Sequence, residues 1–325
     1  MREIAVDAGC SYIKTACYDY TNRIVTHAVP SIVSDEKPMS DLNGNKSPSY
    51  HCEGRQLSII ESSTRYEDTR LPDYPYSSVN TVLMHHALVK SGIRNPEIQL
   101  STSIPLHDYF FRMEESKRRK RESVQRGISS DSGITLPIID HRLTLPEGLA
   151  GWIDLCFDKD GRKKPNLPTG EVGLVDIGGR TTDIAVVNGL KISTDSIDTV
   201  KLGYLDVMDH LNEELNIRFR DSGRFAISAL DKALHSRQIE IESGRVEDIS
   251  EQVDKVLHAF SDRTLQEVNR ILGNRGQLSG TCYFGGGVGH MRDIILKQPK
   301  VFIPENPQFS NVIGCLKAFR ADLSA

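Results

Sequence analysis

Two segments of the chain share one pattern, in which an apolar run ends in an aspartate that is followed at once by a glycine-containing turn. The first segment is Ile4–Lys14 and the second is Val172–Val187, so Asp7 and Asp176 lie at equivalent positions. Each segment predicts a β-hairpin whose turn presents backbone N–H groups to an anion and a carboxylate to a hydrated cation. Two such turns in one chain therefore predict two facing half-sites that bind one polyphosphate.

The size and charge of the chain narrow its class. With 325 residues it is too long for one ordinary core, so we expect two lobes. A net charge of −4 gives no overall attraction to nucleic acid or to an anionic membrane, so contact with either would have to be local or use an adaptor. No apolar run approaches the ~20 residues of a membrane helix, and the first residues lead into a strand rather than a signal peptide. The sequence favours a soluble intracellular protein.

Several common kinds of site have no signature in this chain. The six cysteines are scattered without Cys-x-x-Cys spacing, which favours reduced thiols in a cytosol over a zinc site or a disulfide framework. There is no His-Glu-x-x-His, no Gly-x-Ser-x-Gly elbow and no P-loop Gly-Lys-Ser/Thr. Metalloprotease, α/β-hydrolase and Walker-type interpretations are therefore disfavoured.

The first half of the chain predicts an alternation of strands and helices. Strands are expected at 3–7, 12–18, 23–29, 49–52, 56–59, 98–104, 134–136 and 142–145, and helices at 77–91 and 114–127. The helix 114–127 carries a run of basic side chains, which favours a solvated face but leaves a partner surface open. Of His85 and His86, we expect one to pack and the other to face solvent. The polar stretch 34–49 is expected to be an exposed loop.

The second half predicts a mostly helical region between two strands. The stretch Asp158–Gly170 has the composition of a hinge between lobes. Helices are expected at 204–220, 225–232 and 249–272, followed by a buried strand at 281–284. That strand leads into the glycine-rich turn Gly285–Gly289, which opens a helix. Such a turn can lie flat against a nucleoside or a phosphate, although a tight β–α turn has the same sequence.

The candidate ligands suit a nucleoside triphosphate with magnesium, which needs backbone donors for phosphate, carboxylates that reach metal-bound water and a group that positions the attacking water. Asp7 and Asp176 fit the metal role, acting through water. Lys14 can reach a phosphate, although a surface lysine is an equally good interpretation. Backbone or hydroxyl contacts to phosphate are expected from Gly9, Ser11, Gly178, Gly179, Thr181 and Thr182.

Glu147 is the candidate for orienting or polarising the hydrolytic water. It follows a proline at an expected strand end and precedes Gly148, so its carboxylate can project into a cleft. A glutamate in the first turn of a helix is the structural alternative.

The order of these motifs resembles the actin-like ATPase superfamily, which includes actin, the rod-shape protein MreB, heat-shock chaperone ATPases and sugar kinases. The motifs are Asp7-Ala8-Gly9, Pro146-Glu147, Asp176-Ile177-Gly178-Gly179 and Gly285-Gly286-Gly287. Within the superfamily, the chain most resembles the ParM/StbA plasmid-segregation proteins. That closer resemblance is carried by the segments 4–14, 85–92, 104–110, 145–148 and 176–183, and it covers nearly the whole chain.

The resemblance implies an α/β fold of the actin-like (ribonuclease H-like) type, with a nucleotide in the cleft between two lobes. Lobe I would comprise residues 1–165, with the segment 305–325 packed back on it, and lobe II residues 166–304. The implied cofactors are ATP (or GTP) and Mg²⁺. Asp7 and Asp176 would serve the metal through water, and Glu147 and Asp176 would be catalytic. Nucleotide contacts would come from Asp7, Gly9, Cys10, Ser11, Tyr12, Lys14, Gly178, Gly179, Arg180, Thr181, Gly285, Gly286, Gly287 and Val288.

Two positions depart from the pattern of the superfamily. Arg180 stands where a small residue is common, so the second phosphate turn either carries an extra cation or points it outward. Cys10 stands where a serine or another small hydroxyl residue is expected.

The implied function is an ATPase that polymerises head to tail with ATP and hydrolyses it after assembly, in the bacterial cytoplasm. A ParR-type adaptor on centromeric DNA would link its filaments to low-copy plasmids, so contact with DNA would be indirect and no membrane would take part. One alternative is a non-filamentous ATPase of the same fold, such as a small-molecule kinase or a chaperone-like ATPase. Another is a nucleotide-binding scaffold that does not hydrolyse. No acidic base of a sugar pocket is identifiable, and Glu147 argues against the scaffold.

Overall fold

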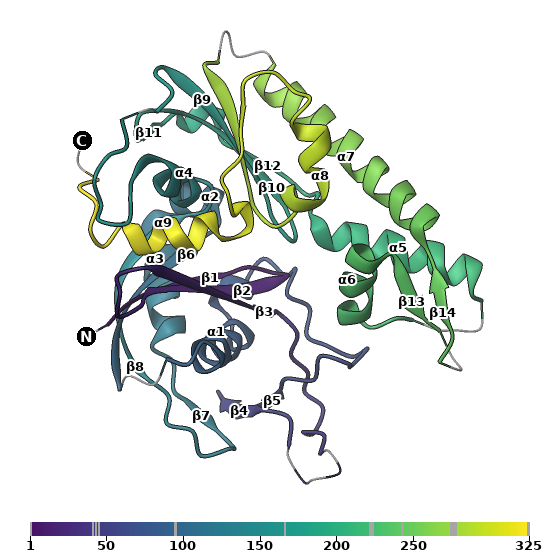
Figure 1. Cartoon of the computed structure of the whole chain (residues 1–325). Helices are drawn as coiled ribbons and strands as arrows, with labels where there is room; N and C mark the ends of the chain where they lie inside the picture. Colours follow the sequence, from purple (N-terminus) through teal and green to yellow (C-terminus); the bar gives the residue numbers. More distant parts are fainter. Residues whose placement is uncertain are drawn as a thin grey trace.

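The computed structural model describes residues 2–40, 42, 44, 46–93, 96–165, 167–220, 224–241, 244–273 and 278–323, and its framework is two mixed sheets (Figure 1). The first sheet has the order β3-β2-β1-β6-β8, with β1 Arg2–Ala8, β2 Tyr12–Tyr18, β3 Ile24–Pro30, β6 Glu97–Ile104 and β8 Ile138–Pro146. The second has the order β11-β10-β9-β15-β16, and β12 also pairs with β10. Its strands are β9 Glu171–Ile177, β10 Thr182–Asn188, β11 Lys191–Ile192, β12 Asp198–Val200, β15 Gly280–Phe284 and β16 Val301–Phe302. Parts of three expected segments, at 34–49, 158–170 and 305–325, lie outside the described residues.

Each sheet has the same arrangement at its centre. In the first, β1 pairs antiparallel with β2 and parallel with β6, and Asp7 lies opposite Lys14. In the second, β9 pairs antiparallel with β10 and parallel with β15, and Asp176 lies opposite Asp183. Both hairpins predicted from the repeated aspartate pattern are therefore confirmed.

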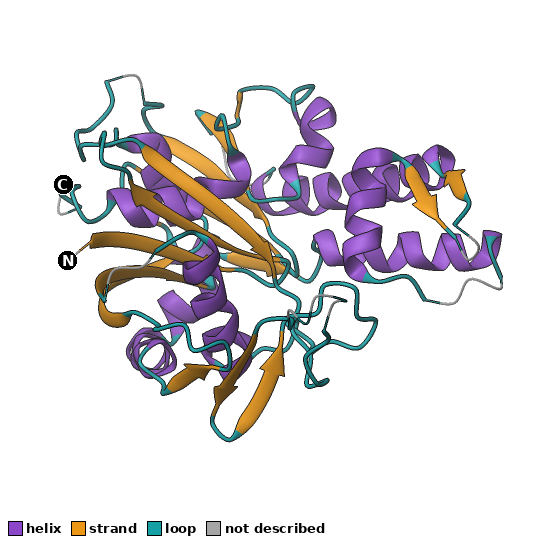
Figure 2. Cartoon of the chain, turned by 60° about the horizontal axis from the view of Figure 1, so that its bottom comes forward, coloured by secondary structure: helices purple, strands orange, loops and turns teal. Residues whose placement is uncertain are grey.

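Helices cover the outer faces of the sheets and fill the space between them. The first half holds η1 Tyr74–Tyr76, α1 Ser78–Lys90, α2 Leu106–Phe111, α3 Met113–Val124 and α4 Leu149–Cys156. The second half holds η2 Thr194–Ser196, α5 Tyr204–Arg218, α6 Ile227–Ser236, α7 Ser250–Leu272, α8 Val288–Ile295, η3 Pro307–Phe309 and α9 Ser310–Lys317. α5, α6 and α7, with the hairpin β13 Gln238–Glu240 and β14 Val246–Asp248, extend away from the sheets (Figure 1, Figure 2). Among the described helices, none is both long and apolar enough to cross a bilayer.

α4 and α9 lie between the two sheets, because both sheets turn apolar side chains toward them. Along β1 the residues alternate: Ile4 and Val6 join a core with α1, whereas Ala5 joins a core with α4 and α9. The second sheet contributes Leu174 of β9 and Phe284 of β15 to that same central core. α9 thus brings the chain back from the second sheet into contact with β1, β2 and β6.

The predicted elements are confirmed in most places and wrong in a few. Residues 134–136 form no strand; β8 begins at Ile138, after Pro137, which has no N–H to donate to a ladder. Short strands that the pattern did not reveal are β11, β12, β13, β14, β16 and β7 Ile128–Ser130. β7 pairs with β4 Ser49–Cys52, which lies beside β5 Arg55–Ser58. Strands of two or three residues are too short to show a clear alternation.

The basic helix α3 is only in part the solvated face expected. Arg118 is exposed and pairs with Glu122, but Lys120 is fully buried. The Lys120 ammonium donates to the carbonyl of Pro75 at 3.1 Å and to Asn80 Oδ1 at 2.9 Å, and burial lowers its pKa to about 8. α3 therefore holds η1 in place.

The two adjacent histidines of α1 are both buried, so the expectation that one faces solvent is wrong. The Nδ1 atom of His86 is 3.0 Å from the Tyr50 hydroxyl. Within the described residues, neither ring nitrogen of His85 has a hydrogen-bond partner. Burial lowers the pKa of both rings to about 4.

We predict that His85→Leu makes the protein more resistant to acid. The folded-state pKa of His85 is below its unfolded value of about 6.5, so the unfolded state binds more protons and stability falls as the pH falls from about 6.5 to about 4. Removing this group should raise the free energy of unfolding at pH 5, relative to pH 7.5, by about 2 kcal/mol. Urea denaturation at the two pH values measures this, with His258→Leu, on an exposed helix position, as the control. An unchanged pH dependence in His85→Leu would contradict the prediction.

Candidate functional site

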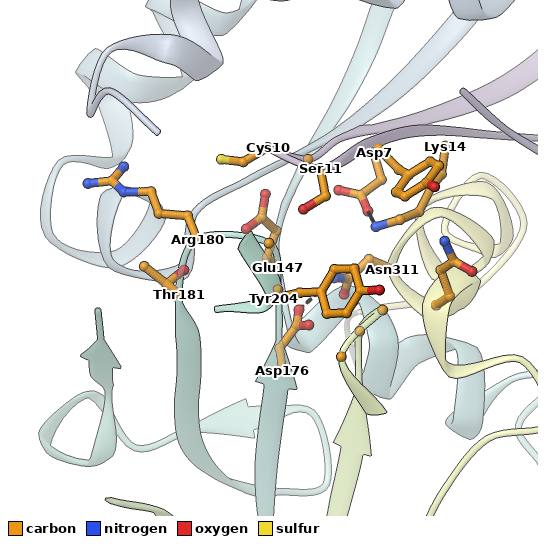
Figure 3. A pocket seen from close by; sticks show the side chains of 18 of the residues that line it. Asp7, Cys10, Ser11, Lys14, Glu147, Asp176, Arg180, Thr181, Tyr204 and Asn311 are labelled. Carbon is orange, nitrogen blue, oxygen red and sulfur yellow. Dashed lines mark hydrogen bonds and ion pairs between the residues drawn. The ribbon is translucent and has the colours of Figure 1, made fainter. Parts of the chain in front are cut away.

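A cavity of about 680 Å³ lies where the two hairpin turns face each other (Figure 3). Its wall is completed by the end of β8, the turn after β15 and the start of α9. Fifteen of the residues predicted for the site line it: Asp7, Gly9, Cys10, Ser11, Tyr12, Lys14, Glu147, Asp176, Gly178, Gly179, Arg180, Thr181, Gly285, Gly286 and Gly287. The structure therefore brings together residues from four separate parts of the chain.

Two predicted contributors point elsewhere. Val288 is fully buried in the hydrophobic core beneath α8 and does not line the cavity. Thr182 is also buried, and its hydroxyl donates to the carbonyl of Leu202 at 2.8 Å. Both predictions were wrong. Thr182 begins β10, where successive side chains point to opposite faces of the sheet, and Val288 begins α8 on the side of the helix that packs into the core.

The two turns touch directly. A Cβ atom on Gly179 would lie 2.2 Å from Ser11 Oγ and 2.9 Å from the Ser11 nitrogen, so only glycine permits this approach. Within the described residues, Ser11 Oγ is buried and has no hydrogen-bond partner. An unsatisfied buried hydroxyl on the cavity wall fits a ligand that accepts a hydrogen bond, such as a phosphate oxygen.

On the first hairpin, both carboxylate oxygens of Asp7 are held. Lys14 Nζ donates to Oδ2 at 2.9 Å and the Ser103 hydroxyl donates to Oδ1 at 2.6 Å. Burial disfavours the charged Lys14 ammonium, but the carboxylates of Asp7, Asp176 and Glu147 together outweigh it and raise its pKa. Lys14 is therefore a charged site residue and not the surface lysine of the alternative interpretation.

On the second hairpin, burial raises the pKa of Asp176, and a hydrogen bond from Asn311 Nδ2 to its Oδ2 at 2.6 Å partly offsets this. The neighbouring Asp183 accepts from Thr199 at 2.5 Å and from Thr181 at 3.2 Å. Burial raises the pKa of Asp183 to about 6 in spite of these bonds.

Glu147 stands between the two hairpins. Its backbone N–H donates to Ile104 at 2.9 Å, and Gly148, with φ of +74°, turns the chain into α4. Burial and the carboxylates of Asp7, Asp183 and Asp176 raise the pKa of Glu147 well above its ordinary value. The carboxylates of Asp7, Asp176 and Glu147 thus converge on the ammonium of Lys14, and a divalent cation would relieve their mutual repulsion.

The carboxylates that line the cavity suit a magnesium ion bound through its water ligands. Among the described residues, no three His, Cys, Asp or Glu side chains lie close enough together to hold a metal ion directly. The oxygen atoms of the cavity carboxylates are of the kind that bind Mg²⁺, an ion that keeps several water ligands in proteins.

The glycine turn after β15 is required mainly by contact with β9. Gly285 has a φ of +89°, and a Cβ there would lie 2.6 Å from Asp176 Oδ1. A Cβ on Gly287 would lie 2.4 Å from the Ile177 side chain. The N–H groups of Gly285 and Gly287 donate to Pro307 and Ile177, whereas a Cβ on Gly286 would meet only Gln308 Cγ at 3.9 Å, so Gly286 is the one of these three best placed to offer its backbone to a ligand.

The two departures from the family pattern both line the cavity. Arg180 contributes a guanidinium, labelled in Figure 3, whose positive charge acts on Cys10 and Asp183. Burial raises the pKa of the Cys10 thiol to about 12, so this cysteine is protonated and serves as a small uncharged wall residue.

The far end of the cavity is an aromatic wall that sequence reasoning missed. Tyr204 and His290 stack at 4.7 Å between ring centres, and His235 lies 4.7 Å from His290. Asp231 accepts hydrogen bonds from the hydroxyls of Tyr204 and Tyr12, which joins α6 to the first hairpin. Burial lowers the pKa of His290 to about 4, so this ring is uncharged near neutral pH. Tyr204 comes from α5, His290 from α8, and Asp231 and His235 from α6, so no single stretch of sequence predicts this wall.

Comparisons with known proteins agree with this geometry. Residues 2–154 match the family model of the plasmid segregation protein ParM, N-terminal part, and residues 174–297 match that of archaeal MreB-like actin homologues, C-terminal part. No curated protein matches the sequence.

Similar solved structures cover almost all of the chain. One is a 15-stranded ParM filament from Clostridium botulinum, with a TM-score of 0.74 and 18% identity over 98% of both chains. Another is an archaeal actin homologue in complex with ADP, with a TM-score of 0.73 and 19% identity over 99% of this chain and 100% of that one. A third is Bacillus thuringiensis ParM with ATP, with a TM-score of 0.65 and 14% identity over 98% of both chains. At these identities the likeness shows a shared fold.

Proposed function

Because the chain is an actin-like protein of the ParM type, with the fold that its motifs implied, we propose that it binds and hydrolyses ATP with Mg²⁺ and polymerises into filaments that segregate low-copy plasmid DNA. The observation that supports this most strongly is the convergence of both aspartate hairpins on one cavity of nucleotide size. The proposed site lies between lobe I, residues 1–165 with 305–325, and lobe II, residues 166–304.

The phosphates would lie between the two hairpin turns. Backbone N–H groups of residues 9–11 and 179–181, the Lys14 ammonium and the Ser11 hydroxyl, which has no partner among the described residues, would supply donors there. Asp7 and Asp176 would hold the metal through its water ligands. When bound, Mg²⁺ would neutralise charge on the phosphates and so favour their transfer to water.

Glu147 would orient the attacking water. Glu147 follows β8 and lines the cavity with both hairpin turns. Its raised pKa brings it closer to the range of an efficient general base. The aromatic wall of Tyr204 and His290 would receive the base. Nothing in that wall separates ATP from GTP, so either nucleotide fits the proposal.

The proposed partners are a second copy of the chain, in a head-to-tail filament, and a ParR-type adaptor bound to centromeric DNA. The net charge of −4 supports indirect contact with DNA, because it supplies no general attraction to phosphate backbones. The proposed location is the bacterial cytoplasm.

Light scattering tests the assembly that we propose. With Mg²⁺ and ATP the scattering of the purified protein is expected to rise at least about fivefold and then decay as phosphate is released, because hydrolysis would weaken the filament. ADP and an EDTA-treated sample are the controls. Hydrolysis or phosphate transfer to an added sugar, without any rise, would support the non-filamentous alternative. Binding with neither a rise nor hydrolysis would support a scaffold.

A further inference from the structure

Asn311 lines the cavity, and no sequence motif predicted it as a site residue. It is the second residue of α9, its side chain is only 6% exposed, and it points toward Asp176 from the α9 side of the cavity (Figure 3). α9 follows η3, so the residue stands where the chain passes from the second sheet back to the first.

The Asn311 amide joins the two halves of the site with three hydrogen bonds. Its Nδ2 donates to Asp176 Oδ2 at 2.6 Å. Its Oδ1 accepts from the backbone N–H groups of Gly148 and Gly151, each at 3.0 Å. Asparagine is the shortest side chain that carries a double donor and an acceptor on one rigid plane, so it can serve both sides at once.

The acceptor side of this amide fixes the turn that carries Glu147. Gly148 precedes the first residue of α4, and the first N–H groups of a helix have no partner within the helix. Asn311 satisfies two of them from a different helix. The backbone of Glu147 is held on its other side by the carbonyl of Ile104, so the turn is anchored at both ends.

α9 itself cannot shift easily against α4. A Cβ on Gly314 would lie 1.7 Å from the carbonyl oxygen of Ala150, so the two helices pack backbone to backbone. At the other end of α9, Lys317 Nζ is bonded to the carbonyl and carboxylate of Asp154 and to the carbonyl of Phe157, at 2.6 to 2.9 Å. The Asn311 amide is therefore carried on a rigid pair of helices.

We infer that Asn311 is a positioning residue, which holds the metal-binding Asp176 and the water-orienting Glu147 turn at one fixed separation. It touches neither nucleotide nor water in this role; it acts through Asp176 and through the first turn of α4. This inference rests on the function proposed above, and it makes α9 the element that couples the two lobes at the reacting end of the cavity.

The test is a double-mutant cycle between Asn311 and Asp176, read by the affinity for a fluorescent ADP analogue with Mg²⁺ and with EDTA. Asn311→Ala is expected to lower affinity in Mg²⁺ at least about 10-fold and affinity in EDTA less than about 3-fold. In the Asp176→Ala background the same change should lower the affinity in Mg²⁺ less than about 2-fold, because the group it positions is gone. Ser310→Ala, the neighbouring buried position, is the matched control and should behave as wild type.

A purely structural role gives a different result. Asn311→Ala would then lower the melting temperature, but the Mg²⁺ dependence and kcat of the folded protein would equal those of wild type, or the effects of Asn311 and Asp176 would add. Either outcome overturns the inference. A wild-type protein without Mg²⁺-dependent nucleotide binding would instead overturn the proposed function.

A second variant covers the case in which Asn311→Ala does not fold. Asn311→Asp keeps an oxygen that can accept from Gly148 and Gly151, but loses the donor to Asp176 and places a second carboxylate beside it. It is expected to fold and to lower kcat at least about 10-fold at saturating ATP and Mg²⁺, because the two carboxylates repel each other. A wild-type kcat in this variant would contradict a positioning role.

Discussion

Replacing Glu147 by glutamine is expected to slow ATP hydrolysis at least about 100-fold while leaving nucleotide binding and assembly intact. The amide has the size of the carboxylate, so the turn after β8 and the bonds that fix it should persist. The glutamine amide can neither accept a proton from the attacking water nor bind that water as strongly as a carboxylate does. A filament that forms but does not lose its phosphate should also be longer lived.

Single-turnover phosphate release measures the first effect, and the decay of light scattering measures the second. Glu122→Gln removes a carboxylate from the exposed face of α3 and is the control. Because Glu147 is buried among other carboxylates, its replacement should not lower the melting temperature of the nucleotide-free protein. Normal turnover by Glu147→Gln would remove this residue from the mechanism.

Asp176→Ala is expected to abolish the part of nucleotide affinity that depends on Mg²⁺, a loss of about 100-fold or more when magnesium is present. Asp176 is the carboxylate at the tip of the second hairpin, 5% exposed, and it faces the cavity opposite Asp7. Without it, one side of the proposed metal site has no carboxylate to bind the metal's water ligands. The variant with Mg²⁺ should bind nucleotide about as weakly as wild type does in EDTA.

Isothermal titration with ADP, in Mg²⁺ and in EDTA, measures both values on the same protein, so the EDTA arm controls for damage to the nucleotide pocket. Equal affinity of the variant and wild type in Mg²⁺ would refute the metal role of Asp176. A loss of affinity of equal size in both conditions would mean that the substitution disturbs the glycine turn at Gly285, which lies against the Asp176 side chain.

The sequence was sufficient for the framework of this protein where the signal is local. The repeated apolar run with an aspartate at its end predicts both hairpins, and these are the centre strands of the two sheets. The helical spacing of 77–91 with Gly92 behind it predicts α1 within one residue at each end. Turn chemistry and side-chain period act over a few residues, so they can be recognised without knowledge of the fold.

The same local reasoning was wrong where burial depends on a distant partner. Nothing near His85 and His86 in the sequence indicates that β4 would cover His86 through Tyr50. Lys120 lies within the basic run of α3 and so looks like a solvated residue, but it is buried because η1 and Asn80 offer it oxygen atoms. Val288 looked like part of a glycine-rich ligand turn and is a core residue.

By itself the sequence determined the two aspartate hairpins, the acidic residue after β8 and the resemblance to actin-like proteins, because each can be recognised from short runs of consecutive residues. Only the tertiary structure decided that Gly179 meets Ser11, that Tyr204 stacks on His290 and that Asn311 joins Asp176 to the turn of α4. Asp176 and Asn311 are 135 positions apart. Their contact exists because α4 and α9 are buried between the two sheets, and no local pattern around either residue predicts which distant segment it will meet.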